Sequence, residues 1–184
     1  MSRMGFVLAG AICLAVAGCS KPAPPPPEPA SLEDGDACMR SRDWTCAAAN
    51  YAGYLKAYPT DGKTQAKLGI SLTRAGKHRE SLPAYKAAEA AGIVTYDLFA
   101  SYAISLEAAG DVDGAIRANR KALEIVPNLV DVRGNLARQL ASKGQTAEAI
   151  KLLDDFDRYL VQQGEQPYFR AQIATIREQA KGAN

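Results

Sequence analysis

The pattern of hydrophobic and polar residues over 96–127 predicts two amphipathic helices joined by a tight turn. Leu98, Tyr102 and Leu106 recur every four residues, which places them on one face of the first helix. Gly110 follows this face and ends the helix, because glycine is well suited to the turn that follows a helix. A proline closes the stretch, and its lack of a backbone N–H ends the second helix. The stretch is therefore interpreted as a helical hairpin.

The same hairpin pattern recurs along the chain at a regular interval. Gly76, Gly110 and Gly144 mark the turn in successive copies and are equally spaced. Independent positions that share one spacing indicate an internal repeat. Two columns of small residues keep the same spacing: Gly35, Gly69, Ala103 and Ala137 in one, and Ala47, Ser81, Ala115 and Ala149 in the other.

A helix–turn–helix unit that repeats every ~34 residues resembles the tetratricopeptide repeat (TPR). In the first repeat, Arg42 stands where the other repeats have the turn glycine. The resemblance implies an all-α fold, a right-handed α-solenoid of about four helix hairpins over 31–163. Residues 164–184 are expected to add a capping helix, with Phe169, Ile173 and Ile176 on its apolar face. The repeats are expected at about 28–61, 62–95, 96–129 and 130–163.

The N-terminal residues 1–18 are interpreted as a signal peptide. One arginine precedes a short apolar run, and small residues and Cys19 follow it. The segment Val16-Ala17-Gly18-Cys19 resembles a bacterial lipobox, which implies cleavage before Cys19 and acylation of its sulfur. An ordinary cleaved signal peptide or a retained hydrophobic anchor is the alternative. Ser20, rather than aspartate, follows the cysteine, and the resemblance to Gram-negative lipoproteins then implies an outer-membrane lipoprotein that faces the periplasm.

The proline-rich segment within 19–30 is expected to be a tether. Proline fixes the backbone angle φ, so Lys21 to Ala30 should form an extended polyproline II rod of about 3.1 Å per residue. A spacer suits a chain that is lipidated just upstream. The alternative is that the segment is a ligand for a proline-binding groove.

Cys38 and Cys46 are the two cysteines left after signal cleavage and acylation. An even pair in an oxidising compartment predicts a disulfide bond, here between the two helices of the first repeat. Two buried free thiols are the alternative. Metal binding is not expected, since no cluster of histidine and acidic residues accompanies the pair.

The sequence shows no arrangement that predicts an enzyme or a cofactor site. His78 is the only histidine and is expected in a solvated turn, without a nucleophile. Asp154, Asp155 and Asp157 point in different directions on a helix, so they are interpreted as a solvated face. Loss of Arg3 with the signal would leave 21 basic and 20 acidic residues, a balance that does not favour nucleic-acid binding.

What remains is a surface for a protein partner. In the TPR family, the first helices of the repeats line a concave groove. Two isoleucines in an otherwise polar channel would suit a helix or an extended peptide, and Arg74 and Arg138 could hold carboxylates. Ordinary solvated surface is the alternative. The residues that the resemblance places in the groove are Met39, Arg40, Ile70, Thr73, Arg74, Ile104, Glu107, Asn135 and Arg138.

The main functional hypothesis is therefore an outer-membrane-anchored adaptor that binds another envelope protein. The chain is similar to the TPR lipoproteins of bacterial pilus assembly, some of which act as pilotins for secretins. The alternatives are a scaffold that recruits peptidoglycan enzymes or a protease, and a periplasmic chaperone.

Overall fold

The structure, a computed structural model, describes residues 31–182. The predicted signal peptide, Cys19 and the proline-rich tether lie outside the described residues. The described part contains nine α-helices and no strand, and the predicted all-α helical-repeat fold is confirmed for it. The helices are α1 (Leu32–Arg40), α2 (Trp44–Tyr54), α3 (Gly62–Arg74), α4 (His78–Ala90), α5 (Tyr96–Ala108), α6 (Val112–Ile125), α7 (Val130–Ser142), α8 (Thr146–Gln162) and α9 (Arg170–Gly182).

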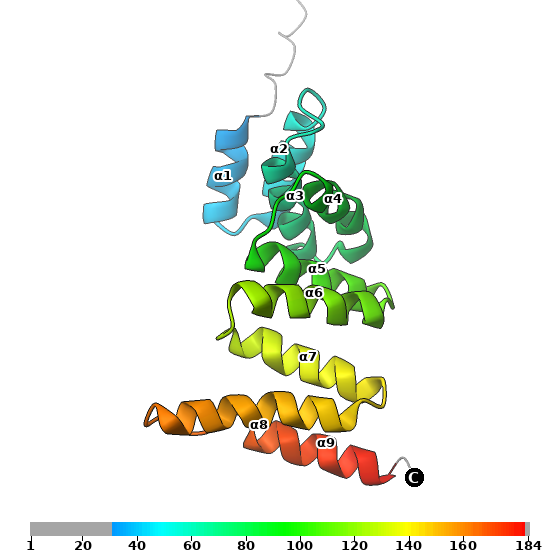
Figure 1. The fold of residues 1–184 in the computed structure, drawn as a ribbon. Coiled ribbons are helices and arrows are strands. Elements are labelled where there is room, and N and C mark those ends of the chain that lie inside the picture. Colours follow the sequence, from blue (N-terminus) through cyan, green and yellow to red (C-terminus); the bar gives the residue numbers. More distant parts are fainter. Residues whose placement is uncertain (1–30, 183–184) are drawn as a thin grey trace, which may run out of the picture.

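The first eight helices form four hairpins that stack in chain order, and α9 follows the last hairpin (Figure 1). Within the C-terminal half, α5, α7 and α9 run in one direction and α6 and α8 run in the opposite direction (Figure 1). The first helices of the last two hairpins are therefore parallel to each other, and α9 continues that series (Figure 1).

The turns inside the hairpins follow the predicted repeat spacing. Gly76, Gly110 and Gly144 have φ angles of 77°, 92° and 76°, in the left-handed region that favours glycine. Arg42 has a φ of 60°, although it carries a side chain. In each turn the next backbone N–H returns to a helix carbonyl, as in the bond of 2.9 Å from Asp43 N to Cys38 O. The turn geometry is thus retained in the first repeat at the expense of backbone strain at Arg42.

Helix packing inside the first two hairpins depends on a glycine opposite a tyrosine. Tyr51 and Tyr85 are fully buried, and a Cβ atom added at Gly35 or Gly69 would lie 2.6 or 2.8 Å from the nearest ring carbon. Real Cβ atoms do not approach carbon so closely, so alanine does not fit there without a shift. The third and fourth hairpins have alanine at this position, and the tyrosine is replaced by Asn119 and by Leu153.

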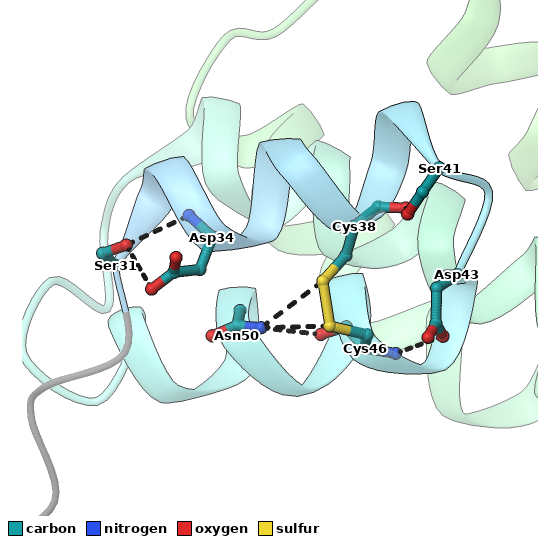
Figure 2. The surroundings of a disulfide bond; sticks show 7 residues. All are labelled: Ser31, Asp34, Cys38, Ser41, Asp43, Cys46 and Asn50. Atoms are coloured by element: carbon teal, nitrogen blue, oxygen red, sulfur yellow. Dashed lines mark hydrogen bonds between the residues drawn. A yellow bond between two sulfur atoms is a disulfide. The ribbon is translucent and has the colours of Figure 1, made fainter.

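The first hairpin is held together by polar and covalent contacts more than by a core. Gly35 is the only buried residue of α1. The structure joins Cys38 of α1 to Cys46 of α2 by a disulfide, with the two Cα atoms 5.7 Å apart (Figure 2). The amide of Asn50 lies beside the bond and donates to the carbonyl of Cys46 at 3.1 Å (Figure 2). These contacts fix a short helix at the end of the stack, where it has a neighbour on one side only.

An ion pair connects the first repeat to the second. Lys67 Nζ of α3 lies 2.6 and 2.9 Å from the two carboxylate oxygens of Asp36, and the Tyr51 hydroxyl donates to Asp36 at 2.6 Å. The hydrogen bond from Lys67, followed by that from Tyr51, holds the pKa of Asp36 below its usual value. Asp36 is therefore a charged link between α1, α2 and α3.

The C-terminal helix caps the stack through a buried carboxylate. Ile173 and Ile176 of α9 are buried, and so is Phe169, which precedes the helix. Asp157 of α8 is buried and accepts the backbone N–H groups of Tyr168 at 2.8 Å and Phe169 at 2.9 Å. The expectation of a solvated side chain was therefore wrong for Asp157, because it binds the segment that leads into α9. The same expectation holds for its neighbours Asp154 and Asp155, which are exposed.

Candidate functional site

A cavity of about 830 Å³ opens between α5, α7 and the start of α9. Its apolar wall is formed by Ile104 of α5, Val132 of α7 and Phe169 before α9. Asn135 and Gln172 supply amide groups beside this wall. The cavity lies on the side of the stack made by the first helices of the hairpins, which is the side on which the groove was predicted.

The structure brings together four of the nine predicted groove residues. Arg74, Ile104, Asn135 and Arg138 line the cavity. The remaining five, which do not line it, are Met39, Arg40, Ile70, Thr73 and Glu107.

Thr73 is a core residue and not a groove residue. Its side chain is 6% exposed, and its hydroxyl donates to the Gly69 carbonyl at 2.9 Å. It also shares hydrogen bonds of 2.7 Å with the hydroxyls of Tyr85 and Ser105. The prediction for Thr73 was wrong because the tyrosine of the second hairpin reaches across α3 and buries this position.

Arg138 already has a carboxylate partner inside the chain. Its guanidinium forms a bidentate ion pair with Glu107, in which Nη2 lies 2.9 Å from Oε2. Gln139 Nε2 donates to the same Oε2 at 2.9 Å. The bond from Arg138, followed by that from Gln139, holds the pKa of Glu107 below its usual value. A partner's carboxylate would have to displace Glu107, so Arg138 is a poor first contact for it.

A buried amide pair connects this ion pair to the core. Asn119 Nδ2 donates to Gln139 Oε1 at 2.9 Å, and the two side chains are 2% and 1% exposed. Asn119 also lines the cavity, and within residues 31–182 no group donates a hydrogen bond to its side-chain oxygen. Asn119 therefore brings to the cavity lining an amide whose oxygen is free to accept a hydrogen bond from a ligand.

This polar cluster is the counterpart of the tyrosine cluster one repeat earlier. The positions equivalent to Asn119, Glu107 and Gln139 in the preceding repeat are Tyr85, Thr73 and Ser105. These three also bond to one another, but there Thr73 is the shared partner, whereas in the later cluster it is Gln139. From the second repeat to the third, the large tyrosine is replaced by the smaller asparagine, and the small threonine and serine are replaced by the larger glutamate and glutamine. The sequence signal was available, since both clusters keep the repeat spacing, but it requires three columns to be compared together.

Three charged side chains on the cavity rim have no ion-pair partner in the described part of the chain. Arg74 is the last residue of α3, and Asp97 and Asp131 are the second residues of α5 and α7. All three are exposed. Asp97 accepts only the N–H of the following Leu98, at 2.9 Å. These charges are available to a ligand, whereas Arg138 and Glu107 are not.

The described residues show no other feature of a chemical site. Among residues 31–182 no group of three or more histidine, cysteine and acidic side chains is placed to hold a metal ion. No helix in the same range combines the length and the apolar character that crossing a bilayer requires. His78, expected in a solvated turn, is the first residue of α4 and is half-buried.

Comparison with known proteins identifies the fold. Residues 106–173 match the tetratricopeptide repeat family model. The chain has the fold of a TPR protein. No curated protein matches the sequence significantly.

Several solved TPR-type structures superpose on the chain. The MamA protein does so with a TM-score of 0.61 and 20% identity, over 67% of each chain. YrrB, described as a TPR protein with an unusual peptide-binding site, superposes with a TM-score of 0.62 and 19% identity, over 67% of this chain and 63% of its own. MamA 41-end from Desulfovibrio magneticus RS-1 superposes with a TM-score of 0.61 and 18% identity, over 67% of this chain and 70% of its own. At these identities the likeness establishes the fold of this chain and leaves its partner open.

Proposed function

We propose that this protein is a non-catalytic adaptor that binds a segment of another protein in the groove between α5, α7 and α9. The observation that carries the proposal is the open cavity of about 830 Å³ with an apolar wall and unpaired charges on its rim. Its volume is within the range of about 300–1,000 Å³ that is usual for ligand sites. YrrB, a TPR protein of similar fold, is described as having a peptide-binding site, which supports a peptide as the ligand class.

We further propose that the adaptor is a lipoprotein of the outer membrane that faces the periplasm. The support is the sequence Val16-Ala17-Gly18-Cys19 followed by Ser20 and a proline-rich tether. More than one acyl chain gives a stable anchor, since each buried CH₂ group contributes about 0.8 kcal/mol. The test is metabolic labelling with an alkyne fatty acid, followed by membrane fractionation. Labelling and membrane retention that disappear in Cys19→Ala support the anchor, and an unlabelled mature protein rejects it.

The partner that we propose first is a component of a pilus or secretin assembly. The alternatives are that the protein recruits peptidoglycan enzymes or a protease, or that it acts as a periplasmic chaperone. A photo-crosslinking amino acid at position 104 tests these, because Ile104 lines the cavity and is 44% exposed. The matched control carries the crosslinker at position 117, an exposed site on α6 that does not line the cavity.

Crosslinking in native membranes has distinct outcomes. A secretin or pilus protein captured at 104 and not at 117 supports the first partner, and envelope hydrolases captured in this way support the second. Many unfolded clients support the chaperone. Equal capture at both positions would reject the groove as the binding surface.

A further inference from the structure

The unpaired charges on the cavity rim have a fixed order along the groove. Asp97 and Asp131 lie in the first turns of α5 and α7, and Arg74 is at the last residue of α3. α5 and α7 run in the same direction, so both carboxylates lie at the same end of the groove (Figure 1). The two carboxylates thus come from the N-terminal ends of α5 and α7, whereas the guanidinium comes from the C-terminal end of α3.

The neighbouring charges in the cavity do not change this order. Arg138 also lines the cavity, but its bidentate pair with Glu107 neutralises both groups. Burial is the main cause that raises the pKa of the Tyr85 hydroxyl, and Arg74 and Asp97 affect it with opposite signs. Arg74 and Asp97 therefore act on the same small region with opposite charges.

The cavity between these charges suits an apolar side chain. Ile104, Val132 and Asn119 line it, and the side-chain oxygen of Asn119 has no donor among the described residues. Buried polar atoms usually have a hydrogen-bond partner, so a ligand bound in the cavity can supply the donor that this buried Asn119 oxygen lacks. An aromatic or aliphatic group bound here can thus be accompanied by one hydrogen-bond donor.

We infer that the groove selects an extended segment with a defined order of charges: an acidic residue beside Arg74, an apolar residue at Ile104, and a basic residue beside Asp97 and Asp131. This inference rests on the proposed peptide-binding function. It is carried by charge complementarity, because each unpaired rim charge would gain an opposite charge from such a segment.

The geometry sets the spacing of the two charged ligand residues. α5 has 13 residues. A helix of this length spans about 18–20 Å, which an extended chain covers in about five or six residues. Side chains on a helix lean toward its N-terminus, so the arginine at the end of α3 reaches back into the groove. The acidic and basic residues should therefore be about three to five positions apart.

The experiment is selection of random dodecapeptides by phage display against the full-length protein in detergent micelles. The enriched sequences should carry acidic, apolar and basic residues in this order or its reverse along the peptide. One enriched peptide, labelled with fluorescein, then provides binding constants by fluorescence anisotropy. One variant is Arg74→Gln, which removes the positive charge. The other is Asp97→Asn with Asp131→Asn, which removes both negative charges but leaves a side-chain oxygen at each position that can still accept a hydrogen bond. Each should weaken binding by about 3- to 10-fold and flatten its dependence on salt.

Matched controls and a charge reversal make the result specific. Arg117→Gln and Asp154→Asn neutralise exposed charges outside this cavity and should leave affinity unchanged. Arg74→Glu should change the selected residue at that end from acidic to basic. If peptides bind in the groove without charge order, or with the same preference in every variant, the inference is overturned while the groove function stands. If no peptide binds in the groove, both fail.

Discussion

Replacing Gly69 by alanine should not stabilise the fold and should destabilise it by up to about 2 kcal/mol, although alanine is the better helix former. In the middle of α3, this change would gain about 1 kcal/mol of helix propensity. The added Cβ would, however, lie 2.8, 2.9 and 3.0 Å from three ring carbons of Tyr85. Carbon atoms in contact are normally about 3.5–4.0 Å apart, so the ring or the helix must move.

The ring has little room to move. Tyr85 is fully buried, and its hydroxyl is held by Thr73 at 2.7 Å. Overpacking of such a site costs about 1–3 kcal/mol, which exceeds or cancels the gain in propensity. Tyr85→Leu should remove the conflict, because the fourth hairpin pairs Ala137 with Leu153 at the equivalent positions. In that background Gly69→Ala should stabilise the protein by about 1 kcal/mol.

A double-mutant cycle measures the conflict directly. Urea unfolding followed by far-UV circular dichroism gives the free energy of unfolding of the parent, both single variants and the double variant. The coupling between the two sites should be about 1–3 kcal/mol. Additive effects, or a Gly69→Ala variant that is stabilised equally in both backgrounds, would show that the glycine is not required by the tyrosine ring.

Three further predictions concern the ends of the stack and its charged links. Cys38→Ser with Cys46→Ser should lower the free energy of unfolding by about 2–3 kcal/mol, and hydrogen exchange should rise first in α1. Asp157→Ala leaves two N–H groups without their acceptor, so it should cost about 1–3 kcal/mol and expose α9 to exchange. Asp36 and Glu107 have lowered pKa values, so the stability that they contribute is present above the ordinary carboxyl pKa of about 4 and is lost as pH falls below it. The urea midpoint should fall with acidification in that window, and less so in Asp36→Asn with Glu107→Gln.

The fold could be predicted from the sequence because each hairpin repeats the same local requirements. The left-handed turn needs glycine at 76, 110 and 144, and the structure has positive φ angles at these positions. Within the predicted capping segment 164–184, α9 begins only at Arg170, because Asp157 binds the N–H groups of the two preceding residues and holds them outside the helix. Such a contact joins residues of different helices, and a pattern along one helix does not reveal it.

The candidate site could be predicted only in part, because the same repeat position can be core or groove. Thr73 and Glu107 are equivalent in the repeat, yet Thr73 is buried by Tyr85 and Glu107 pairs with Arg138. What differs is the residue at the tyrosine position of the following helix, which is Tyr85 in the second hairpin and Asn119 in the third. A tyrosine fills the space beside the first helix, whereas the smaller asparagine lines the cavity and has a side-chain oxygen without a donor among the described residues. The groove therefore opens where the tyrosine column ends, and its position follows from comparing side-chain volumes between repeats, not from the groove positions of the family.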